Sequence, residues 1–304
     1  MVERLLPGLI FGVLSACSFA LAAPFARLAF ENGVAPVDAV AVRALVAFIV
    51  LSVIIKLSGE AFHVPREARL PLIGLGVSTT LISCAYLSSV TFIPVGVAVI
   101  IFFTFPIFIL VLSPFVEKTR FGLDRFIIGL IALFGLYLAV GSNSSLENLD
   151  WRGLVLAGIG ALAGTGQIFF GRAVASKAYG PTMVWGAHFI ILPATILVSQ
   201  IFGGALFTQA GLSSVMVPGF VAIVVICLGY LSGYLFQIRA LTNAPASYIG
   251  SVFNVEPIVS TSLAAYLFGE RLANVQYAGG ALVLTALVLS SVLSLRAGRL
   301  VVAK

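Results

Sequence analysis

The stretch Phe92–Val116 reads FIPVGVAVIIFFTFPIFILVLSPFV and contains no charged side chain over 25 residues. The hydrocarbon core of a bilayer is about 30 Å thick and needs about 20 apolar residues per helix, so this stretch predicts a transmembrane helix. The whole chain shares the bias, because 61% of its 304 residues are hydrophobic and 9% are charged, whereas soluble domains carry about 25% charged residues. So little charge cannot cover a surface that faces water, and we expect an integral membrane protein.

The same criterion divides nearly the whole chain into ten expected transmembrane helices, and no stretch is left for a separate soluble domain. Because the apolar runs are continuous and do not alternate, they favour an all-α bundle over a closed β-barrel. The spans fall near Leu5–Phe30, Val37–Leu57, Leu70–Val90, Phe92–Val116, Leu123–Gly141, Arg152–Phe170, Thr182–Phe207, Val215–Ile238, Pro245–Phe268 and Val275–Leu295.

Lysine and arginine gather on one side of these spans, the side that holds both termini and the even-numbered loops. The other side has Arg27, Arg152 and Arg271, while Arg43 lies within the second span. By the positive-inside rule, both termini are expected in the cytoplasm and the chain in the inner (plasma) membrane. The net charge of +6 therefore reflects topology, and no nucleic-acid partner is expected. The basic side carries Arg4, Lys56, Arg66, Arg69, Lys118, Arg120, Arg125, Arg172, Lys177, Arg239, Arg296, Arg299 and Lys304.

The two halves of the chain, residues 1–145 and 146–304, are expected to be two repeats of five helices each. Five is an odd number, so the second half enters the membrane upside down relative to the first. Inverted repeats are typical of secondary transporters, which expose one site to alternate sides of the membrane. Chance matching of a few prolines is the alternative. A shift of 145 residues pairs Arg27 with Arg172, Pro36 with Pro181 and Arg43 with His188, and a shift of 151 pairs Pro94 with Pro245, Pro106 with Pro257, Arg120 with Arg271 and Gly129 with Gly280.

The first span has a second interpretation. Arg4, an apolar run and the sequence Ala20-Leu21-Ala22 resemble a signal peptide with its cleavage site. We favour an uncleaved helix, because this span has a counterpart later in the chain.

One segment of the second half carries a family resemblance. The sequence from Asn254–Pro257 (NVEP) through Phe268–Arg271 (FGER), with the ten spans and the paired repeats, resembles the drug/metabolite transporter (DMT) superfamily, EamA type. The first half has a degenerate version, in which Pro106 is followed by Glu117-Lys118. The resemblance covers essentially the whole chain. It implies a carrier of two inverted five-helix repeats with a central cavity, usually an exporter of amino acids or other metabolites, and it does not specify the substrate.

Pro106 and Pro257 lie near the middle of the fourth and ninth spans, at equivalent positions. A proline inside a helix donates no hydrogen bond and displaces the carbonyl four residues earlier, here those of Phe102 and Phe253. Free carbonyls at this depth must face protein, water or a ligand. Matched interruptions in the two halves therefore predict a binding site, and kinks that serve packing alone are the alternative.

Two spans present matching polar and aromatic stripes, because residues at i, i+4 and i+7 share one face of a helix. Faces that contact lipid are more often Leu, Val or Phe, so we expect these faces to line a cavity. Interhelical hydrogen bonding uses the same residue types and is the alternative. The stripes are Thr79, Ser83 and Tyr86 in the third span and Tyr230, Tyr234 and Gln237 in the eighth.

Glu256 lies close to the centre of the ninth span, where an ionised carboxylate is strongly disfavoured. Acids at this depth usually face the protein interior and mark a substrate or proton path. Its counterpart in the first half is Phe105, so the charge breaks the symmetry of the repeats. Two structural alternatives are an ion pair with Arg43 or His188 and a hydrogen bond to Ser260.

Arg43 and His188 occupy equivalent depths in the second and seventh spans. They can bind a substrate carboxylate or gate opposite ends of a pathway. The alternatives are that Arg43 snorkels to the interface and that His188 is a packing residue. Three more residues are expected to contact a substrate: Gln167, Trp185 and Asn254.

These patterns favour a secondary transporter that exports a small metabolite, such as an amino acid, through a central cavity. A lipid flippase and an intramembrane lipid-modifying enzyme are the alternatives. The histidines, His63 and His188, belong to no motif with a nucleophile or metal, which argues against an enzyme. We expect no cofactor or metal, since the sequence contains no nucleotide-binding loop and its cysteines lack the spacing of metal ligands. The Gly279-Gly280 pair can pack within the chain or against a second protomer in a homo-oligomer.

Overall fold

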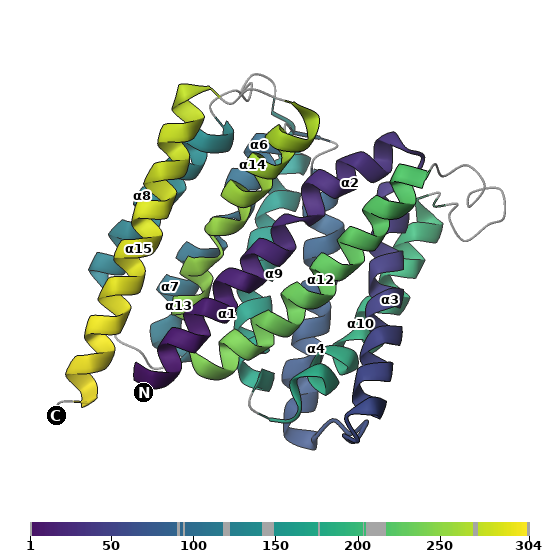
Figure 1. The fold of residues 1–304 in the computed structure, drawn as a ribbon, viewed down its shortest axis with the longest axis horizontal. Helices are drawn as coiled ribbons and strands as arrows, with labels where there is room; N and C mark the ends of the chain where they lie inside the picture. The colour runs from purple at the N-terminus through teal and green to yellow at the C-terminus, as the bar shows by residue number, and fades with distance from the viewer. Residues whose placement is uncertain are drawn as a thin grey trace.

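The computed structural model describes residues 2–89, 92–93, 95–117, 122–141, 149–175, 177–202, 204, 217–269 and 273–302, and these residues form a bundle of helices (Figure 1). Within these ranges no strand occurs. The helices are α1 (Val2–Ala20), α2 (Ala22–Glu31), α3 (Pro36–Leu57), α4 (Arg66–Leu81), α5 (Leu87–Ser89), α6 (Val95–Phe102), α7 (Phe105–Val116), α8 (Leu123–Leu136), α9 (Trp151–Ala175), α10 (Gly180–Ile201), α12 (Val217–Asn243), α13 (Ala246–Val252), α14 (Val255–Phe268) and α15 (Asn274–Val302), with short π-helices η1 (Ile82–Tyr86) and η2 (Tyr137–Gly141).

Several sequence predictions fall outside the described residues. The expected boundary between the repeats, at residues 145 and 146, is one of them. The others are the expected span ends at Val90, Phe207 and Val215 and the residues Pro94, Lys118, Arg120, Glu270, Arg271 and Lys304.

Seven helical runs among the described residues are long and apolar enough to cross a bilayer, and each coincides with an expected span. The remaining expected spans are also helical, but shorter or interrupted: α8 with η2, α13 with α14, and the apolar part of α15. Large apolar side chains remain exposed on the outside of the bundle, including Leu70 (77%), Phe115 (80%) and Leu197 (60%). Water-soluble proteins rarely expose so much apolar surface, so the chain is a multi-pass membrane protein.

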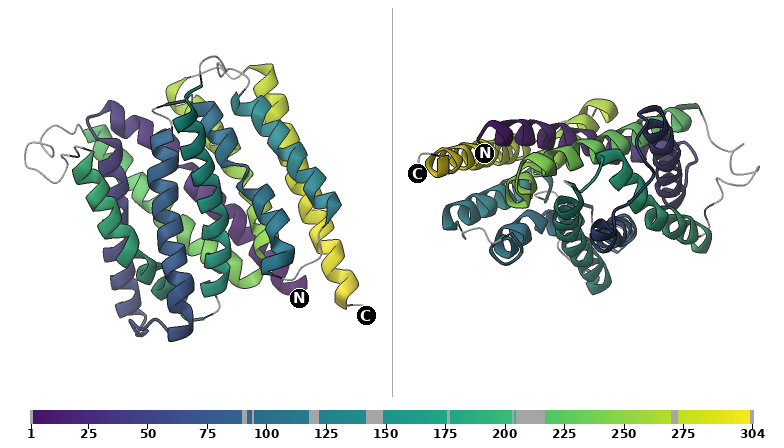
Figure 2. Two further views of the ribbon diagram at one scale, coloured as in Figure 1. Left: turned by 180° about the vertical axis from the view of Figure 1, so that it is seen from behind. Right: turned by 90° about the horizontal axis from the view of Figure 1, so that it is seen from below.

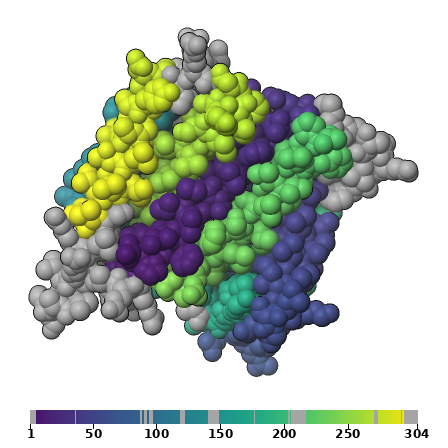
Figure 3. All heavy atoms as spheres, viewed as in Figure 1, coloured from purple at the N-terminus to yellow at the C-terminus, as the bar shows by residue number. Residues whose placement is uncertain are grey.

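Helices from the two halves pack against one another in matched pairs. Helix α1 packs along α12, and α9 packs along α4. The pair α1 and α12 crosses the face seen in Figure 3, and α9 and α4 lie on the opposite face (Figure 2). Helix α3 packs on α10, and α8 packs on α15. Both chain ends lie at the same end of the bundle, at the lower end of Figure 1.

The helix starts repeat along the chain with the spacing that the proline pairs predict. Helix α15 starts 151 residues after α8, and α14 starts within one residue of the position that a shift of 151 assigns to it from α7. Helix α10 starts within one residue of the position that a shift of 145 assigns to it from α3. The hydrophobic pattern and the helix boundaries therefore repeat together.

The fourth and ninth expected spans are each broken into two helices. The breaks lie at Phe103–Thr104, between α6 and α7, and at Phe253–Asn254, between α13 and α14. Pro106 and Pro257 follow the breaks, in the first turn of the next helix, where a missing N–H costs nothing. The prediction of a free Phe253 carbonyl is wrong, because this carbonyl accepts the Glu256 N–H at 3.0 Å. The next helix begins directly after the break, and the N–H of its second residue takes the carbonyl that Pro257 cannot bond.

Glycine allows the close approach of α8 and α15. A Cβ placed on Gly135 would lie 2.9 Å from the carbonyl oxygen of Gly279. This backbone contact accounts for Gly279 within a single chain, as expected for small residues between membrane helices.

Candidate functional site

The polar stripes predicted on the third and eighth spans face each other inside the bundle. The hydroxyls of Thr79 and Tyr234 are hydrogen bonded. Gln167 of α9 donates from Nε2 to Thr79 Oγ1 at 3.1 Å and to Tyr234 Oη at 3.3 Å, and its Oε1 accepts from Gln237 Nε2 at 3.4 Å. Thr79, Tyr234 and Gln237 are fully buried. These four residues, the polar cluster, therefore join three helices in the way that the interhelical alternative predicts.

Arg43 lies beside the polar cluster and does not snorkel to the interface. Its Nη2 donates to Ser83 Oγ at 2.7 Å, and its guanidinium lies over the ring of Tyr230, 4.7 Å from the centroid. Ser83 lies on η1 and Tyr230 on α12, so helices of both halves hold this side chain. We call Arg43, Ser83, Tyr230 and His188 the arginine site.

His188 orients Tyr230 at the arginine site. Its Nδ1 lies 2.7 Å from the carbonyl oxygen of Val184, and its Nε2 lies 3.3 Å from the hydroxyl of Tyr230. A carbonyl can only accept, so Nδ1 carries the hydrogen, and Nε2 of the neutral ring accepts from Tyr230. His188 is fully buried and positions the tyrosine that lies against Arg43.

A chain of aromatic rings connects the arginine site with the two helix breaks. Phe19 of α1 lies 6.4 Å from Tyr230 and 6.1 Å from Phe253, measured between ring centroids. Phe253 lies 6.2 Å from Phe105, so the two breaks face each other. Tyr86 stacks at 4.6 Å on Phe102, at the other break. The two breaks and the arginine site therefore lie next to one another inside the bundle, joined by contacts between aromatic rings.

Glu256 reaches this region from the first turn of α14 and is half-buried. In the part of the chain that the structure describes, its carboxyl makes no hydrogen bond or ion pair, so neither the pairing with Arg43 or His188 nor the bond to Ser260 is observed. The Glu256 N–H is bonded to the carbonyl of Phe253, whose ring lies 6.1 Å from that of Phe19 and 6.2 Å from that of Phe105.

Two predicted residues lie apart from the arginine site. Trp185 packs against Phe48, Phe62 and Phe189, and its Nε1 donates to Ser52 Oγ at 2.8 Å. These contacts fix Trp185 in an aromatic group between α3 and α10.

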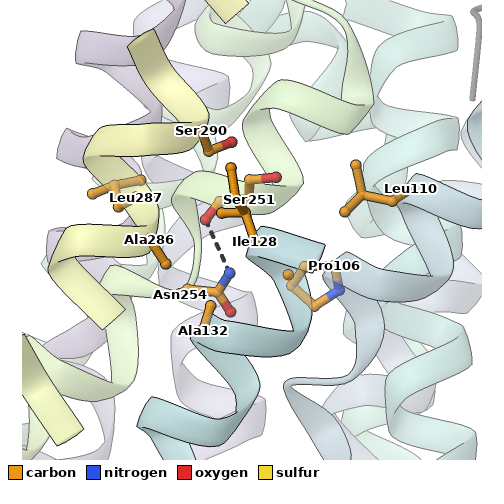
Figure 4. A pocket seen from close by; sticks show the side chains of 10 residues that line it. Pro106, Leu110, Ile128, Ala132, Ser251, Asn254, Ala286, Leu287 and Ser290 are labelled. Atoms are coloured by element: carbon orange, nitrogen blue, oxygen red, sulfur yellow. Dashed lines mark hydrogen bonds between the residues drawn. The ribbon is translucent and has the colours of Figure 1, made fainter. Parts of the chain in front are cut away.

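Asn254 lines a small pocket with room for about one water molecule (Figure 4). Its Nδ2 donates to the Ser251 carbonyl at 3.1 Å. Pro106 lines the same pocket from α7, and Ser290 lines it from α15. Asn254 therefore links the helix break to the contact between the halves.

Ionic contacts close the end of the bundle that holds both termini. Glu117 Oε1, at the end of α7, accepts the Ala246 N–H at the start of α13 at 3.0 Å. Arg172 of α9 lies 3.9 Å from the same oxygen and donates to the Leu241 carbonyl of α12. We call these contacts the Glu117 network. At the opposite end Arg27, the sequence counterpart of Arg172, lies 4.0 Å from the centroid of the Phe268 ring.

The sequence prediction included neither Phe19 nor the Glu117 network. Phenylalanine is common in lipid-facing positions, and the chain contains 24 of them, so Phe19 carries no signal of its own. The network did carry a signal, because Arg172 is paired with Arg27 in the repeat and Glu117 belongs to the degenerate motif of the first half.

The sequence profile of the EamA-like transporter family matches residues 6–141 and 151–292. Among curated proteins, the chain is similar to the threonine/homoserine exporter RhtA of Escherichia coli (strain K12), at 24% identity over 69% of this chain and 67% of that protein. It is also similar to the threonine/homoserine exporter RhtA of Salmonella typhimurium (strain LT2), at 25% identity over the same shares.

A solved crystal structure, described as that of a protein, has a similar fold. It superimposes with a TM-score of 0.75 over 96% of this chain and 99% of its own, at 17% sequence identity. At this identity the likeness concerns the fold alone.

Proposed function

The chain belongs to the EamA-like transporter family, and we propose that it is a secondary transporter that exports a small metabolite, such as an amino acid, by alternating access. The observation that carries this proposal is the placement of two ionisable side chains inside the bundle, Arg43 on α3 and Glu256 on α14. Charged groups within a membrane are costly and usually mark a substrate or ion path. The similar proteins are named as exporters of threonine and homoserine, two small polar amino acids.

The proposed architecture is ten transmembrane helices in two inverted repeats, residues 1–145 and 146–304. The packing supports it, because exchanging the halves turns the pair α1 and α12 into the pair α9 and α4. The same exchange maps the contact of α3 with α10 onto itself, and likewise that of α8 with α15. A pattern unchanged by exchange is expected of halves related by a two-fold axis.

The proposed substrate cavity lies between the halves, where the arginine site meets the two helix breaks. Its walls come from α3, η1, α12 and α14, and therefore from both repeats. Movement of one repeat against the other changes the end at which such a site is open. The polar cluster is assigned to positioning the walls, since its side chains hydrogen-bond one another across three helices.

The proposed orientation places both termini in the cytoplasm, in the inner (plasma) membrane. Most Lys and Arg residues belong to the side of the termini, and the positive-inside rule places that side in the cytoplasm. The common end of both termini in Figure 1 supports the same topology.

The test is counterflow in sealed proteoliposomes preloaded with a mixed pool of amino acids and metabolites. We expect protein-dependent accumulation of a labelled solute, with small polar amino acids among those exchanged. Protein-free liposomes control for leakage, and the exposed variant Glu67→Gln controls for handling of a mutant protein. No accumulation of any solute in well-sealed vesicles would overturn the proposal and bring forward a lipid flippase, which a headgroup-translocation assay on the same vesicles detects.

A further inference from the structure

The structure leaves two opposite charges inside the bundle without ionic partners. Arg43 makes one hydrogen bond, to Ser83, and one ring contact, to Tyr230, in the part of the chain that the structure describes. A guanidinium has five N–H donors and strongly prefers a bidentate anion. The nearest acid on its own helix, Asp38, accepts a hydrogen bond from Ser199 at 2.6 Å. The remaining donors of Arg43 therefore suit an anion that is not part of the protein.

Glu256 is the acidic counterpart of Arg43, because among the described residues its carboxyl also has no ionic partner. It lies in the first turn of α14, directly after the helix break, and no cation of the described residues lies within 4.0 Å of its carboxyl. A cationic ligand would stabilise the ionised carboxylate in this environment, because without a cation its buried charge is uncompensated.

Aromatic contacts link the two charges. The ring of Tyr230, beneath the Arg43 guanidinium, lies 6.4 Å from the ring of Phe19, and Phe19 lies 6.1 Å from Phe253. The carbonyl of Phe253 accepts the Glu256 N–H at 3.0 Å. Ser83, which binds Arg43, lies on the π-helix η1, and π-helical turns occur frequently at functional sites. Arg43 and Glu256 thus approach one region from α3 and α14 without forming a pair with each other.

We propose that this arrangement is a zwitterion site for neutral α-amino acids, in which Arg43 takes the carboxylate and Glu256 takes the ammonium. The inference rests on the proposed function and names its substrate class. A zwitterion satisfies both charges at once, whereas a simple amine or a simple acid leaves one of them uncompensated. His188 holds Tyr230, and Tyr230 and Ser83 hold the guanidinium, so these three are positioning residues.

The test measures inhibition of labelled L-threonine counterflow in proteoliposomes by three probes. L-homoserine keeps both charged groups, N-acetyl-L-threonine lacks the ammonium, and 1-amino-2-propanol lacks the carboxylate. For wild type we expect each single-charge probe to inhibit more weakly than L-homoserine by about 10- to 100-fold, the value of one charge-assisted hydrogen bond.

The two site variants are expected to spare different single-charge probes, whereas loss of structure would weaken the binding of every probe. Arg43→Met should lower the apparent affinity for L-threonine and L-homoserine by about tenfold or more and leave the apparent affinity for 1-amino-2-propanol unchanged. Glu256→Gln should lower the apparent affinity for the same two amino acids and leave the apparent affinity for N-acetyl-L-threonine unchanged. Arg152→Met and Glu67→Gln remove charges of the same kind at exposed positions and should retain the wild-type ranking. Arg43→Lys keeps the charge and should keep the ranking at lower affinity, which guards against misfolding of Arg43→Met.

Three results would overturn the zwitterion site. The first is wild-type inhibition by a single-charge probe as strong as by L-homoserine. The second is an equal loss for all probes in both variants. Either result leaves protein-dependent threonine counterflow, and with it the proposed function, intact. The third is exchange of other solutes with none of L-threonine, which limits the transporter to a different substrate class, while no exchange of any solute removes the proposed function itself.

Discussion

Replacement of Glu117 by alanine is expected to open the end of the bundle that holds both termini. The Glu117 carboxylate joins α7 to the start of α13 through the Ala246 N–H at 3.0 Å, and it lies 3.9 Å from Arg172 of α9. Arg172 in turn holds the end of α12 through the Leu241 carbonyl. One side chain therefore connects helices of both halves at this end, and its removal favours the conformation in which they separate.

The size of the effect follows from these contacts. A hydrogen bond to a charged group contributes about 1.5–3 kcal/mol, and an ion pair that is partly exposed adds at most about 1 kcal/mol. The Arg172 side chain is 35% exposed and the distance of 3.9 Å is long for an ion pair, so the low end applies. A loss of about 1.5 kcal/mol changes an equilibrium between closed and open states about tenfold.

The native cysteines provide the assay. Cys84 follows Ser83 on η1 beside the arginine site and is half-buried, so its reactivity reports whether that region is open to water. In a Cys17→Ser, Cys227→Ser background, a membrane-impermeant maleimide is added from the side of the termini. Glu117→Ala should raise the initial labelling rate of Cys84 about tenfold, in proportion to the open population.

The matched control is Glu67→Ala. Glu67 belongs to the same end of the bundle, but its side chain is 80% exposed and lies 3.7 Å from Lys177, so its removal should leave the labelling rate unchanged. An unchanged rate in a monodisperse Glu117→Ala protein would refute the argument. An equal increase in Glu67→Ala would refute it as well, because the effect would then be one of net charge.

The remaining predictions concern stability and topology. Tyr234→Phe removes the hydroxyl that bonds Thr79 and Gln167, and it should lower the free energy of unfolding by about 1 kcal/mol in a detergent titration; a Tyr234→Phe, Thr79→Val double mutant should lose less than the sum of the single losses. Gly135→Val places a side chain against the Gly279 carbonyl and should destabilise the protein by about 1–3 kcal/mol in thermal unfolding, whereas Gly158→Val, where no atom lies within 4 Å of a new Cβ, should be neutral. Green fluorescent protein fused to either terminus should fluoresce, because we expect both termini in the cytoplasm; a dark fusion of normal expression level would contradict the proposed orientation.

The sequence predicted the position of the spans well, because the thickness of a bilayer fixes the length of each one. Each span must be about 20 apolar residues long, and the two spans with matched prolines are both broken just before the proline, at Phe103–Thr104 and at Phe253–Asn254. The place of the breaks was less predictable. A proline lacks the N–H of the helical hydrogen bond and its ring clashes with the carbonyl four residues earlier. The chain therefore breaks before Pro106 and Pro257, so that each lies in the first turn of a new helix.

The contacts of individual side chains could not be predicted in the same way. The stripe residues Thr79 and Tyr234 did meet, because both lie on the faces where the halves touch, yet nothing in the sequence indicated that they would satisfy each other. Trp185 was expected in the cavity and packs with Phe48 and Phe62 instead. Its direction depends on the rotation of α10 about its own axis, which packing against neighbouring helices determines.

Several charged residues of one half are not repeated in the other half, so different contacts must break when each end of the bundle opens. Arg43 is paired in the repeat with His188, Glu256 with Phe105, and Glu117, by the same shift of 151, with Phe268. If the halves exchange conformations, the end of the termini must break the Glu117 network, while the opposite end must separate Arg27 from the Phe268 ring. Breaking the charge-assisted hydrogen bond of Glu117 costs about 1.5–3 kcal/mol. By the zwitterion proposal, a ligand that enters from the cytoplasm supplies part of this free energy through its contacts with Arg43 and Glu256.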